Sequence, residues 1–371
     1  MKLIKTILIV CFTIFYVNAQ ETSLTLKEAF KGKFLIGTAM NAYQIMGKDT
    51  AATNIIKKQF NAIVAENCMK SERIHPREDK FDFSLADKFV QFGTDNNLVV
   101  TGHTLIWHSQ APDWFFVDDA GKMVSKETLI ARMKNHIQTI VTRYKGKIKG
   151  WDVVNEAIND DGTYRSSKFY QIIGEDYIKL AFQFAREADP DAELYYNDYS
   201  MSIPAKRNGV VAMVKKLQKQ GITIDAIGMQ SHLGLDNPDI KDFEASLEAF
   251  SSLECKVMIT EMDISILPFP DKNAGAEVTK SFEYKQQMDP YRESVPDSVT
   301  TAFEQRYLSF FKLFEKHKKA VTRVTLWGVT DANSWKNNWP VPGRKDYPLL
   351  FSRNYAPKPI VDKIIKQTLS E

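Results

Sequence analysis

Eight short apolar segments constrain the fold of this 371-residue chain more than any other feature. Each is followed by a stretch with helical periodicity, so strand and helix alternate eight times. Runs of Val, Ile, Leu and Ala are typical of parallel strands that are buried on both faces. The strands are expected to begin near Lys33, Asn61, Leu98, Gly150, Glu193, Asp225, Lys256 and Arg323. No Pro-, Gly- or Ser-rich tether separates the units and no solenoid repeat occurs, so the sequence predicts an α/β fold, a single closed (β/α)₈ barrel over residues 20–371.

Two of the intervening helices have recognisable ends. Ser125 is a candidate N-cap for a helix that Gly146 would terminate, and Gly221 would terminate a second helix. Apolar residues recur at three- and four-residue steps in both, which predicts one buried face for each helix. The two stripes are Ile130, Met133, Ile137, Val141 and Tyr144 in the first, and Val210, Met213, Val214 and Leu217 in the second.

Residues 1–19 are predicted to be a secretory signal peptide. Lys2 and Lys5 precede an apolar run, and Val17-Asn18-Ala19 has the small-residue pattern of a cleavage site. The alternative is a membrane anchor, but the apolar run is shorter than the roughly 20 residues that a membrane span needs. We therefore expect a secreted or periplasmic protein without a membrane span in the mature chain.

Charge and cysteine content exclude several classes of function. Loss of residues 1–19 would lower the formal net charge from +3 to +1, which gives no electrostatic basis for binding nucleic acid. Cys68 and Cys255 lie in apolar segments and are expected to be buried and unpaired, with a disulfide as the alternative. The sequence has no C-x-x-C and no H-E-x-x-H pattern, so we expect no metal and no cofactor. We also expect a monomer.

Polar residues concentrate at the carboxyl ends of the predicted strands. Such residues are costly there unless their polar groups are satisfied, and a barrel places all of these strand ends on one rim, where its active site lies. The residues are Glu66, Asn67, His103, Asn155, Glu156, Asn197, Asp198, Gln230, His232, Glu261, Asp263 and Trp327. This pattern predicts a functional site on that rim.

Alternation along a strand indicates which of these side chains share a side. Gln230 and His232, Glu261 and Asp263, and Asn197 and Tyr199 are two residues apart and should point the same way. Asn155 and Glu156 are neighbours and should point to opposite faces. If both act in one site, the chain must bulge or turn there.

The residue types favour glycoside hydrolysis. Two glutamates on separate strands, Glu156 and Glu261, can protonate a leaving oxygen and place negative charge beneath an oxocarbenium-like carbon. Amides such as Asn155 and Gln230 can bind sugar hydroxyls. The indoles of Trp107, Trp327 and Trp335 suit the apolar faces of sugar rings.

From about Phe34 to Pro359 the sequence resembles glycoside hydrolase family 10, the endo-β-1,4-xylanases. Eight stretches in the family's order carry the resemblance: GTA (37–39), ENCMK (66–70), GHTLIWHSQAPDW (102–114), WDVVNEAI (151–158), YYNDY (195–199), DAIGMQSHL (225–233), ITEMDI (259–264) and TLWGVTDANSW (325–335).

The resemblance implies roles for individual residues. Glu156 matches the family's general acid/base and Glu261 its nucleophile, which would be about 5 to 5.5 Å apart in a retaining enzyme. Asn155 would bind the sugar's 2-hydroxyl, and His232 with Asp263 behind it would hold Glu261 ionised. The substrate, xylan or a xylo-oligosaccharide, would also contact Glu66, Asn67, Lys70, His103 and Gln110 on the non-reducing side, Trp107, Gln230, Trp327 and Trp335 beside the scissile bond, and Tyr199 on the far side.

Departures from the family pattern leave the two glutamates untouched. Ser71 stands where the family often has tryptophan and Thr101 where it often has arginine, which bears on subsite affinity. The polar stretch Asp271–Ser298 is expected to be a βα loop on the catalytic face. The competing interpretations are the same chemistry on another β-1,4-glycan such as cellulose or glucan, a barrel that binds glycan without cutting it, and a metal-dependent hydrolase.

Overall fold

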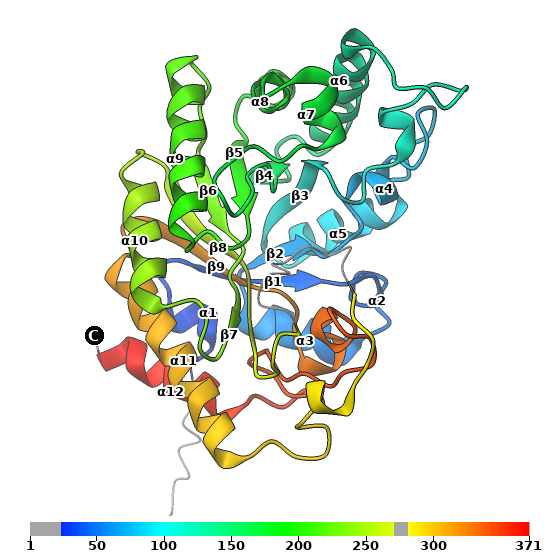
Figure 1. The fold of residues 1–371 in the computed structure, drawn as a ribbon. Coiled ribbons are helices and arrows are strands. Elements are labelled where there is room, and N and C mark those ends of the chain that lie inside the picture. The colour runs from blue at the N-terminus through cyan, green and yellow to red at the C-terminus, as the bar shows by residue number, and fades with distance from the viewer. Residues whose placement is uncertain (1–23, 271–280, 371) are drawn as a thin grey trace, which may run out of the picture.

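The eight predicted apolar segments form parallel strands in a computed structural model that describes residues 24–270 and 281–370 (Figure 1). The predicted signal peptide lies outside the described residues. The barrel strands are β1 (Leu35–Met40), β2 (Ala62–Ala65), β3 (Val99–Trp107), β4 (Gly150–Asn155), β5 (Glu193–Asp198), β6 (Ala226–Met229), β8 (Lys256–Ser265) and β9 (Val321–Leu326). Their residues are almost all buried, as expected for strands covered on both faces.

Strand pairing closes the sheet into a barrel. The strands pair in the order β6-β5-β4-β3-β2-β1-β9-β8, and β6 also pairs with β8, which completes the ring. A short strand, β7 (His232–Gly234), continues the direction of β6 and pairs with the end of β8. Gln230 and Ser231 separate β6 from β7, and Ser231 has a left-handed φ of 64°. The predicted barrel is confirmed, and its sixth strand is broken into two pieces at the rim.

Helices surround the strands, as Figure 1 shows. One long helix follows each barrel strand, and four shorter helices lie in the connections or at the start. The long ones are α3 (Thr50–Gln59), α5 (Ser84–Asp95), α6 (Lys126–Arg143), α8 (Asp176–Ala188), α9 (Pro204–Lys219), α10 (Ile240–Ser251), α11 (Asp297–Lys316) and α12 (Pro359–Ser370); the short ones are α1 (Leu26–Ala29), α2 (Ala42–Ile45), α4 (Ser71–Ile74) and α7 (Lys168–Ile173).

The predicted helix ends are largely confirmed. Ser125 caps α6, because its side chain accepts a hydrogen bond from the amide of Thr128 at 3.2 Å. The helix ends at Arg143, and Gly146 follows in a left-handed conformation with φ 73°. Gly221 does the same after α9, with φ 77°. Both apolar stripes face inward, and Ile130 alone among the nine residues is only partly buried.

The strands and the inner faces of the helices form one hydrophobic core. Cys68 and Cys255 are buried in it as free thiols, so the prediction of unpaired cysteines is confirmed. Removing a large apolar side chain from such a core costs about 2 to 5 kcal/mol of unfolding free energy. The rim at the carboxyl ends of the strands therefore rests on a scaffold whose strands cannot shift without losing this packing.

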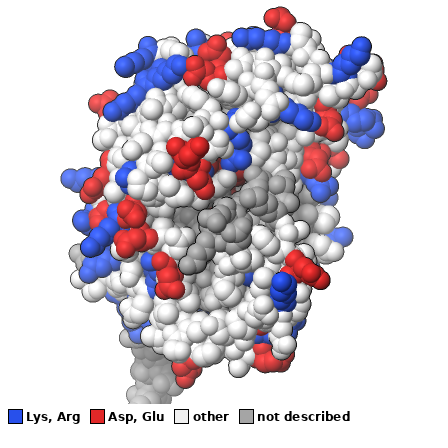
Figure 2. Space-filling view, viewed as in Figure 1, with Lys and Arg blue, Asp and Glu red and all other residues white. Residues whose placement is uncertain are grey.

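The face drawn in Figure 2 gives no sign of a single-sign electrostatic field. Figure 2 shows Lys, Arg, Asp and Glu side chains interspersed over the face that it presents. No helix in the described part of the chain is long and apolar enough to cross a membrane. Of the stretch Asp271–Ser298, residues 281–296 lie between β8 and α11, on the carboxyl side of the strand as predicted, while residues 271–280 lie outside the described residues.

Candidate active site

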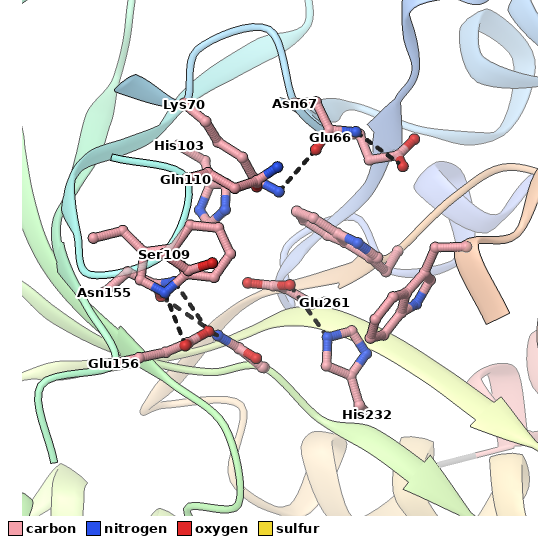
Figure 3. A pocket seen from close by; sticks show the side chains of 14 residues that line it. Glu66, Asn67, Lys70, His103, Ser109, Gln110, Asn155, Glu156, His232 and Glu261 are labelled. Carbon is pink, nitrogen blue, oxygen red and sulfur yellow. Dashed lines mark hydrogen bonds and ion pairs between the residues drawn. The ribbon is translucent and has the colours of Figure 1, made fainter. Parts of the chain in front are cut away.

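A cavity of about 360 Å³ opens at the carboxyl ends of the strands. Its walls come from the ends of β2, β3, β4, β6, β7, β8 and β9 and the loops that follow them (Figure 3). The lining residues are Glu66, Asn67, Lys70, His103, Trp107, Ser109, Gln110, Asn155, Glu156, Gln230, His232, Glu261, Trp327 and Trp335. The structure thus brings together polar residues as far apart in the sequence as Glu66 and Glu261, as the strand-end pattern predicts.

Glu156 sits in a tight turn at the end of β4. The strand ends at Asn155, and Glu156 has a left-handed φ of 59°. The turn lets both neighbouring side chains enter the cavity, which confirms that the chain turns here. A left-handed conformation costs a residue with a Cβ about 1 kcal/mol or more. The guanidinium of Arg165 offsets part of that cost, because its Nε donates to the Glu156 carbonyl at 2.9 Å.

The Glu156 carboxyl is buried and accepts hydrogen bonds from neutral donors. Oε1 accepts from Gln230 at 2.9 Å and from Asn155 at 3.2 Å, and Oε2 accepts from the Trp107 indole at 2.8 Å. Burial raises the pKa of Glu156 to about 7, and the charges of Asp198 and Glu261 add to the increase. This carboxyl therefore holds a proton at neutral or mildly acidic pH.

The Glu261 carboxyl is equally buried but remains ionised. Oε1 accepts from the amide of Asn197 at 2.8 Å, and Oε2 lies 3.2 Å from Nε2 of His232. Burial alone would raise the pKa of Glu261, but His232, His103 and Asn197 outweigh it, so the pKa lies below its usual value. Two carboxyls in one cavity thus differ in protonation at the same pH.

His232 is oriented by the residues behind it. Its Nδ1 lies 3.0 Å from Oδ2 of Asp263, which also accepts a hydrogen bond from the Trp335 indole at 2.7 Å. The β7–β8 pairing places His232 opposite Asp263 in register. Burial opposes a charge on His232, but Asp263 and Glu261 raise its pKa overall. Asp263 thus contacts His232 from one layer behind the cavity wall, and its implied role in holding Glu261 ionised stays a prediction.

A relay of amides connects the two carboxyls. Gln230 donates to Glu156 and, at 3.4 Å, to Oδ1 of Asn155, while Asn197 donates to that same oxygen at 3.0 Å and to Glu261. The hydroxyl of Thr260 donates to Oδ1 of Asn197 at 2.6 Å and fixes the orientation of that amide. The relay ties the two carboxyls into one hydrogen-bonded network.

The opposite wall presents further groups to a ligand. Nζ of Lys70 lies 2.9 Å from Oδ1 of Asn67 and 5.0 Å from the centre of the Trp107 ring. Burial lowers the pKa of Lys70, against the pull of Glu261 and Glu66. Nδ1 of His103 is 2.9 Å from Asp152, so Nε2 is the ring nitrogen available to a ligand.

The structure does not bring every predicted contact into the cavity. Tyr199 is buried outside it, with its hydroxyl accepting from Arg165 at 2.7 Å and Nζ of Lys206 lying 3.6 Å from the ring centre. Its stacking role stays a prediction. The sequence places Asn197 on the rim without a role, and it misses Ser109, which lies two residues after the end of β3.

The two departures from the family pattern have local partners. The Ser71 hydroxyl lies 3.2 Å from the Leu105 carbonyl and 3.3 Å from Nε2 of His136, so it is tied into the wall beneath Lys70. The Thr101 hydroxyl accepts a hydrogen bond from Arg323 on β9. The barrel interior near Thr101 therefore holds a guanidinium that comes from another strand.

Metal ligation is not a feature of this cavity's contacts. In the described ranges, the one cluster of three or more His and carboxylate ligand atoms is Glu244, Glu248 and His317, on α10 and after α11. Lys316 already pairs with Glu244 at 2.7 Å. A protonated carboxyl and an ionised carboxyl in one cavity can act chemically as a general acid and a carboxylate nucleophile.

The chain matches known proteins over nearly its whole length. Residues 25–367 match the model of Glycosyl hydrolase family 10. An endo-1,4-beta-xylanase A of Xylanibacter ruminicola is 53% identical over 342 residues, which are 92% of this chain and 93% of that protein. An endo-1,4-beta-xylanase A of Caldicellulosiruptor saccharolyticus is 38% identical, over 94% of this chain and 97% of that protein.

Solved structures agree with these matches. A GH10 endoxylanase retrieved from a sugarcane soil metagenome has a TM-score of 0.89 and 43% identity, and the match covers 92% of this chain and 99% of that one. A GH10 protein from Paenibacillus barcinonensis has a TM-score of 0.84 and 39% identity, with 92% and 97% covered.

Proposed function

The chain belongs to glycosyl hydrolase family 10, and on that premise we propose that it is an endo-1,4-β-xylanase that cuts internal bonds of xylan with retention of configuration. The observation that carries the proposal is the pair of buried carboxyls in one cavity, one with a pKa raised to about 7 and one with a lowered pKa. Tryptophans at both ends of that pair suit a chain of sugar rings.

In the first step Glu156 acts as the acid and Glu261 as the nucleophile. The Glu156 proton goes to the glycosidic oxygen as the bond to the anomeric carbon breaks, and a Glu261 oxygen bonds to that carbon. The leaving chain departs as an alcohol, and the sugar remains as an ester of Glu261. Asn197 and His232, which already donate to Glu261, orient its carboxylate for the attack.

In the second step Glu156 acts as the base. It takes a proton from water, whose oxygen attacks the anomeric carbon and displaces Glu261. Two inversions give net retention, and each carboxyl returns to its starting state. Since the relay through Gln230, Asn155 and Asn197 spans both carboxyls, Asn155 is suited to bind the 2-hydroxyl of the reacting sugar.

The remaining lining residues are proposed to bind substrate. The polar groups of Glu66, Asn67, Lys70, His103 and Gln110 suit the hydroxyls of the non-reducing-side sugars. Trp107, Gln230, Trp327 and Trp335 would surround the ring at the scissile bond. The first experiment is digestion of unbranched and branched xylan with product sizing, beside carboxymethyl cellulose. Internal products from xylan and a much lower rate on cellulose are expected, and equal rates would redirect the proposal to another β-1,4-glycan.

Two substitutions test the assigned roles. Glu261→Ala is expected to abolish turnover of every substrate, because no other group can form the intermediate. Glu156→Ala is expected to lower xylan cleavage by about 10² to 10⁴-fold but to spare the first step on aryl xylosides with good leaving groups, which need no proton. Equal losses on both kinds of substrate would remove Glu156 from the acid role.

We further propose that residues 1–19 direct export and that the mature chain begins at Gln20 and acts as a monomer. Terminal sequencing of the protein recovered from the culture medium or the periplasm tests the first point. Light scattering of the purified protein tests the second. An intact Met1 in the active enzyme would contradict the signal-peptide assignment.

A further inference from the structure

We propose that Asp198, with Tyr196 and Lys206, is a positioning residue for Glu156. Asp198 and Tyr196 hold the turn that carries Glu156, and Asp198 places a buried negative charge behind it. The inference deepens the proposed function and rests on it, because it concerns Glu156 as the general acid. None of the three side chains lines the cavity. They would act on the reaction through Glu156.

The side chain of Asp198 lies behind the cavity wall. Its neighbour Asn197 faces the site, so alternation along β5 directs Asp198 outward, toward the helices. The residue is fully buried. Oδ2 accepts the hydroxyl proton of Tyr196 at 2.5 Å, and Oδ1 accepts from the backbone amide of Tyr199 at 2.9 Å.

Strand β5 also binds the backbone on both sides of the acid. The amide of Glu156 donates to the Asn197 carbonyl at 2.9 Å, as in a normal ladder. After Glu156 the chain no longer pairs with the backbone of β5, and side-chain oxygens accept the next amide hydrogen bonds instead of backbone carbonyls. The amide of Ala157 donates to the Tyr196 hydroxyl at 3.1 Å, and the amide of Ile158 donates to Oδ2 of Asp198 at 3.4 Å. These contacts hold the left-handed turn on its far side.

The same carboxyl is paired with a buried cation. Burial raises the pKa of Asp198, and Lys206 and the Tyr196 hydroxyl offset part of that rise. Nζ of Lys206, which is fully buried, lies 2.9 Å from Oδ1 of Asp198 and 3.1 Å from Asp160. Burial opposes charge on Lys206, but the two carboxylates raise its pKa overall, so it keeps its proton. Every contact of Asp198 named above comes from a donor, and a protonated carboxyl would need an acceptor. The arrangement therefore favours a carboxylate.

Charged groups face Glu156 from several elements. Asp198 from β5 and Glu261 from β8 oppose its ionisation, whereas Arg165 from the loop after β4 and Lys70 from the loop after β2 favour it. His108 also lies near, with its Nδ1 4.0 Å from Oε2 of Glu156, and burial raises the pKa of the neighbouring phenols Tyr196 and Tyr199. Among these charges Asp198 raises the pKa of Glu156 most, after burial itself.

The charge effect of Asp198 on Glu156 and the hydrogen bonding of Tyr196 to the turn can be separated by substitution. Asp198→Asn removes the negative charge and leaves Lys206 without its main counterion, and both changes favour ionised Glu156. We expect the basic limb of kcat/KM on xylan to move down by about 0.5 to 1 pH unit, with the acidic limb unchanged. Tyr196→Phe keeps the charges but removes the bond to the turn. It should lower kcat on xylan more than on aryl xylosides, with both limbs unmoved.

A matched control comes from another buried carboxylate. Glu315 on α11 likewise pairs with a lysine, Lys33 at 2.6 Å, and accepts a hydroxyl bond, from Thr368. Glu315→Gln should lower stability without moving either limb. Circular dichroism at each pH confirms that the variants are folded, and Tyr196→Phe alone decides the positioning role if Asp198→Asn does not fold. Equal losses on xylan and aryl xylosides in Tyr196→Phe would overturn that role.

Titration of a ¹³C-labelled Glu156 carboxyl by NMR separates the two possible failures. If Asp198→Asn leaves both the NMR pKa and the basic limb in place, the inference about Asp198 is wrong. If the NMR pKa falls but the limb does not follow it, Glu156 is not the acid and the proposed function is at fault. A parallel downward shift of both supports the inference.

Discussion

Glu156→Gln is expected to gain stability relative to the wild type as pH rises, while it removes the acid. The folded structure holds this carboxyl at a pKa of about 7, whereas the same side chain in the unfolded chain titrates near 4.5. Below pH 4.5 the group is protonated in both states, and above pH 7 it is ionised in both. Between these values the folded state keeps a proton that the unfolded state has lost, so wild-type stability falls as pH rises.

The size of this effect follows from the two pKa values. A shift of about 2.5 units corresponds to about 3.5 kcal/mol, since each unit is worth about 1.4 kcal/mol. A glutamine does not titrate. The variant has its own constant offset, because its amide cannot accept from Gln230, Asn155 and Trp107 at once. That offset does not depend on pH, so the difference in unfolding free energy, variant minus wild type, should grow by about 3 kcal/mol between pH 4 and 8.

Urea unfolding of both proteins at a series of pH values measures this difference. All other groups titrate in both proteins and cancel. Glu261→Gln provides a control of opposite sign. The lowered pKa of Glu261 stabilises the folded wild type at pH values above the usual pKa of a glutamate, and this stabilisation is lost as the pH falls. The same pKa predicts that kcat/KM on xylan falls about tenfold from pH 6 to pH 8. A stability difference for Glu156→Gln that stays flat over this range would refute the assigned pKa.

Three further outcomes are expected. The indole of Trp107 donates to Glu156 and so favours its ionised form. Trp107→Phe removes this bond, so the basic limb of kcat/KM should move to higher pH; a downward movement would contradict this. Asp263→Asn removes the charge behind His232, so the pKa of Glu261 should rise and the acidic limb should move up by about one unit; an unmoved limb would mean that Asp263 only packs. Burial raises the pKa of Cys68 to about 12 and that of Cys255 to about 11, so a thiol reagent should label them only after unfolding, and a reductant should leave Tm unchanged.

The barrel could be predicted because its signal is local. Each strand begins within two residues of the expected position, since buried parallel strands need continuous apolar runs and turns bound them. The break between β6 and β7 could not be predicted in this way. It depends on Ser231 adopting φ 64° and on His232 pairing with Asp263, and both are set by the tertiary position of β8.

The same limit applies to the site. Adjacent Asn155 and Glu156 predicted a bulge or a turn if both act in one site, because alternation along a regular strand points neighbours to opposite faces. The expectation that Tyr199 points to the same side as Asn197 was wrong, because β5 ends at Asp198. Beyond the strand end the period of two no longer holds, and Tyr199 turns toward Lys206 instead. Asn197 lacked a role because its partners, Thr260 and Glu261, lie more than 60 residues away.

The different protonation of the two glutamates arises from their donors and neighbouring charges, because both carboxyls are buried to nearly the same degree. Glu261 receives a bond from an imidazole that Asp263 supports, and from an amide whose orientation the Thr260 hydroxyl fixes. Glu156 receives bonds from neutral amides and an indole, and a carboxylate lies behind it. Since the shared relay ties both carboxyls to one frame, a change in either environment should alter the pH dependence of the reaction before it alters the shape of the cavity.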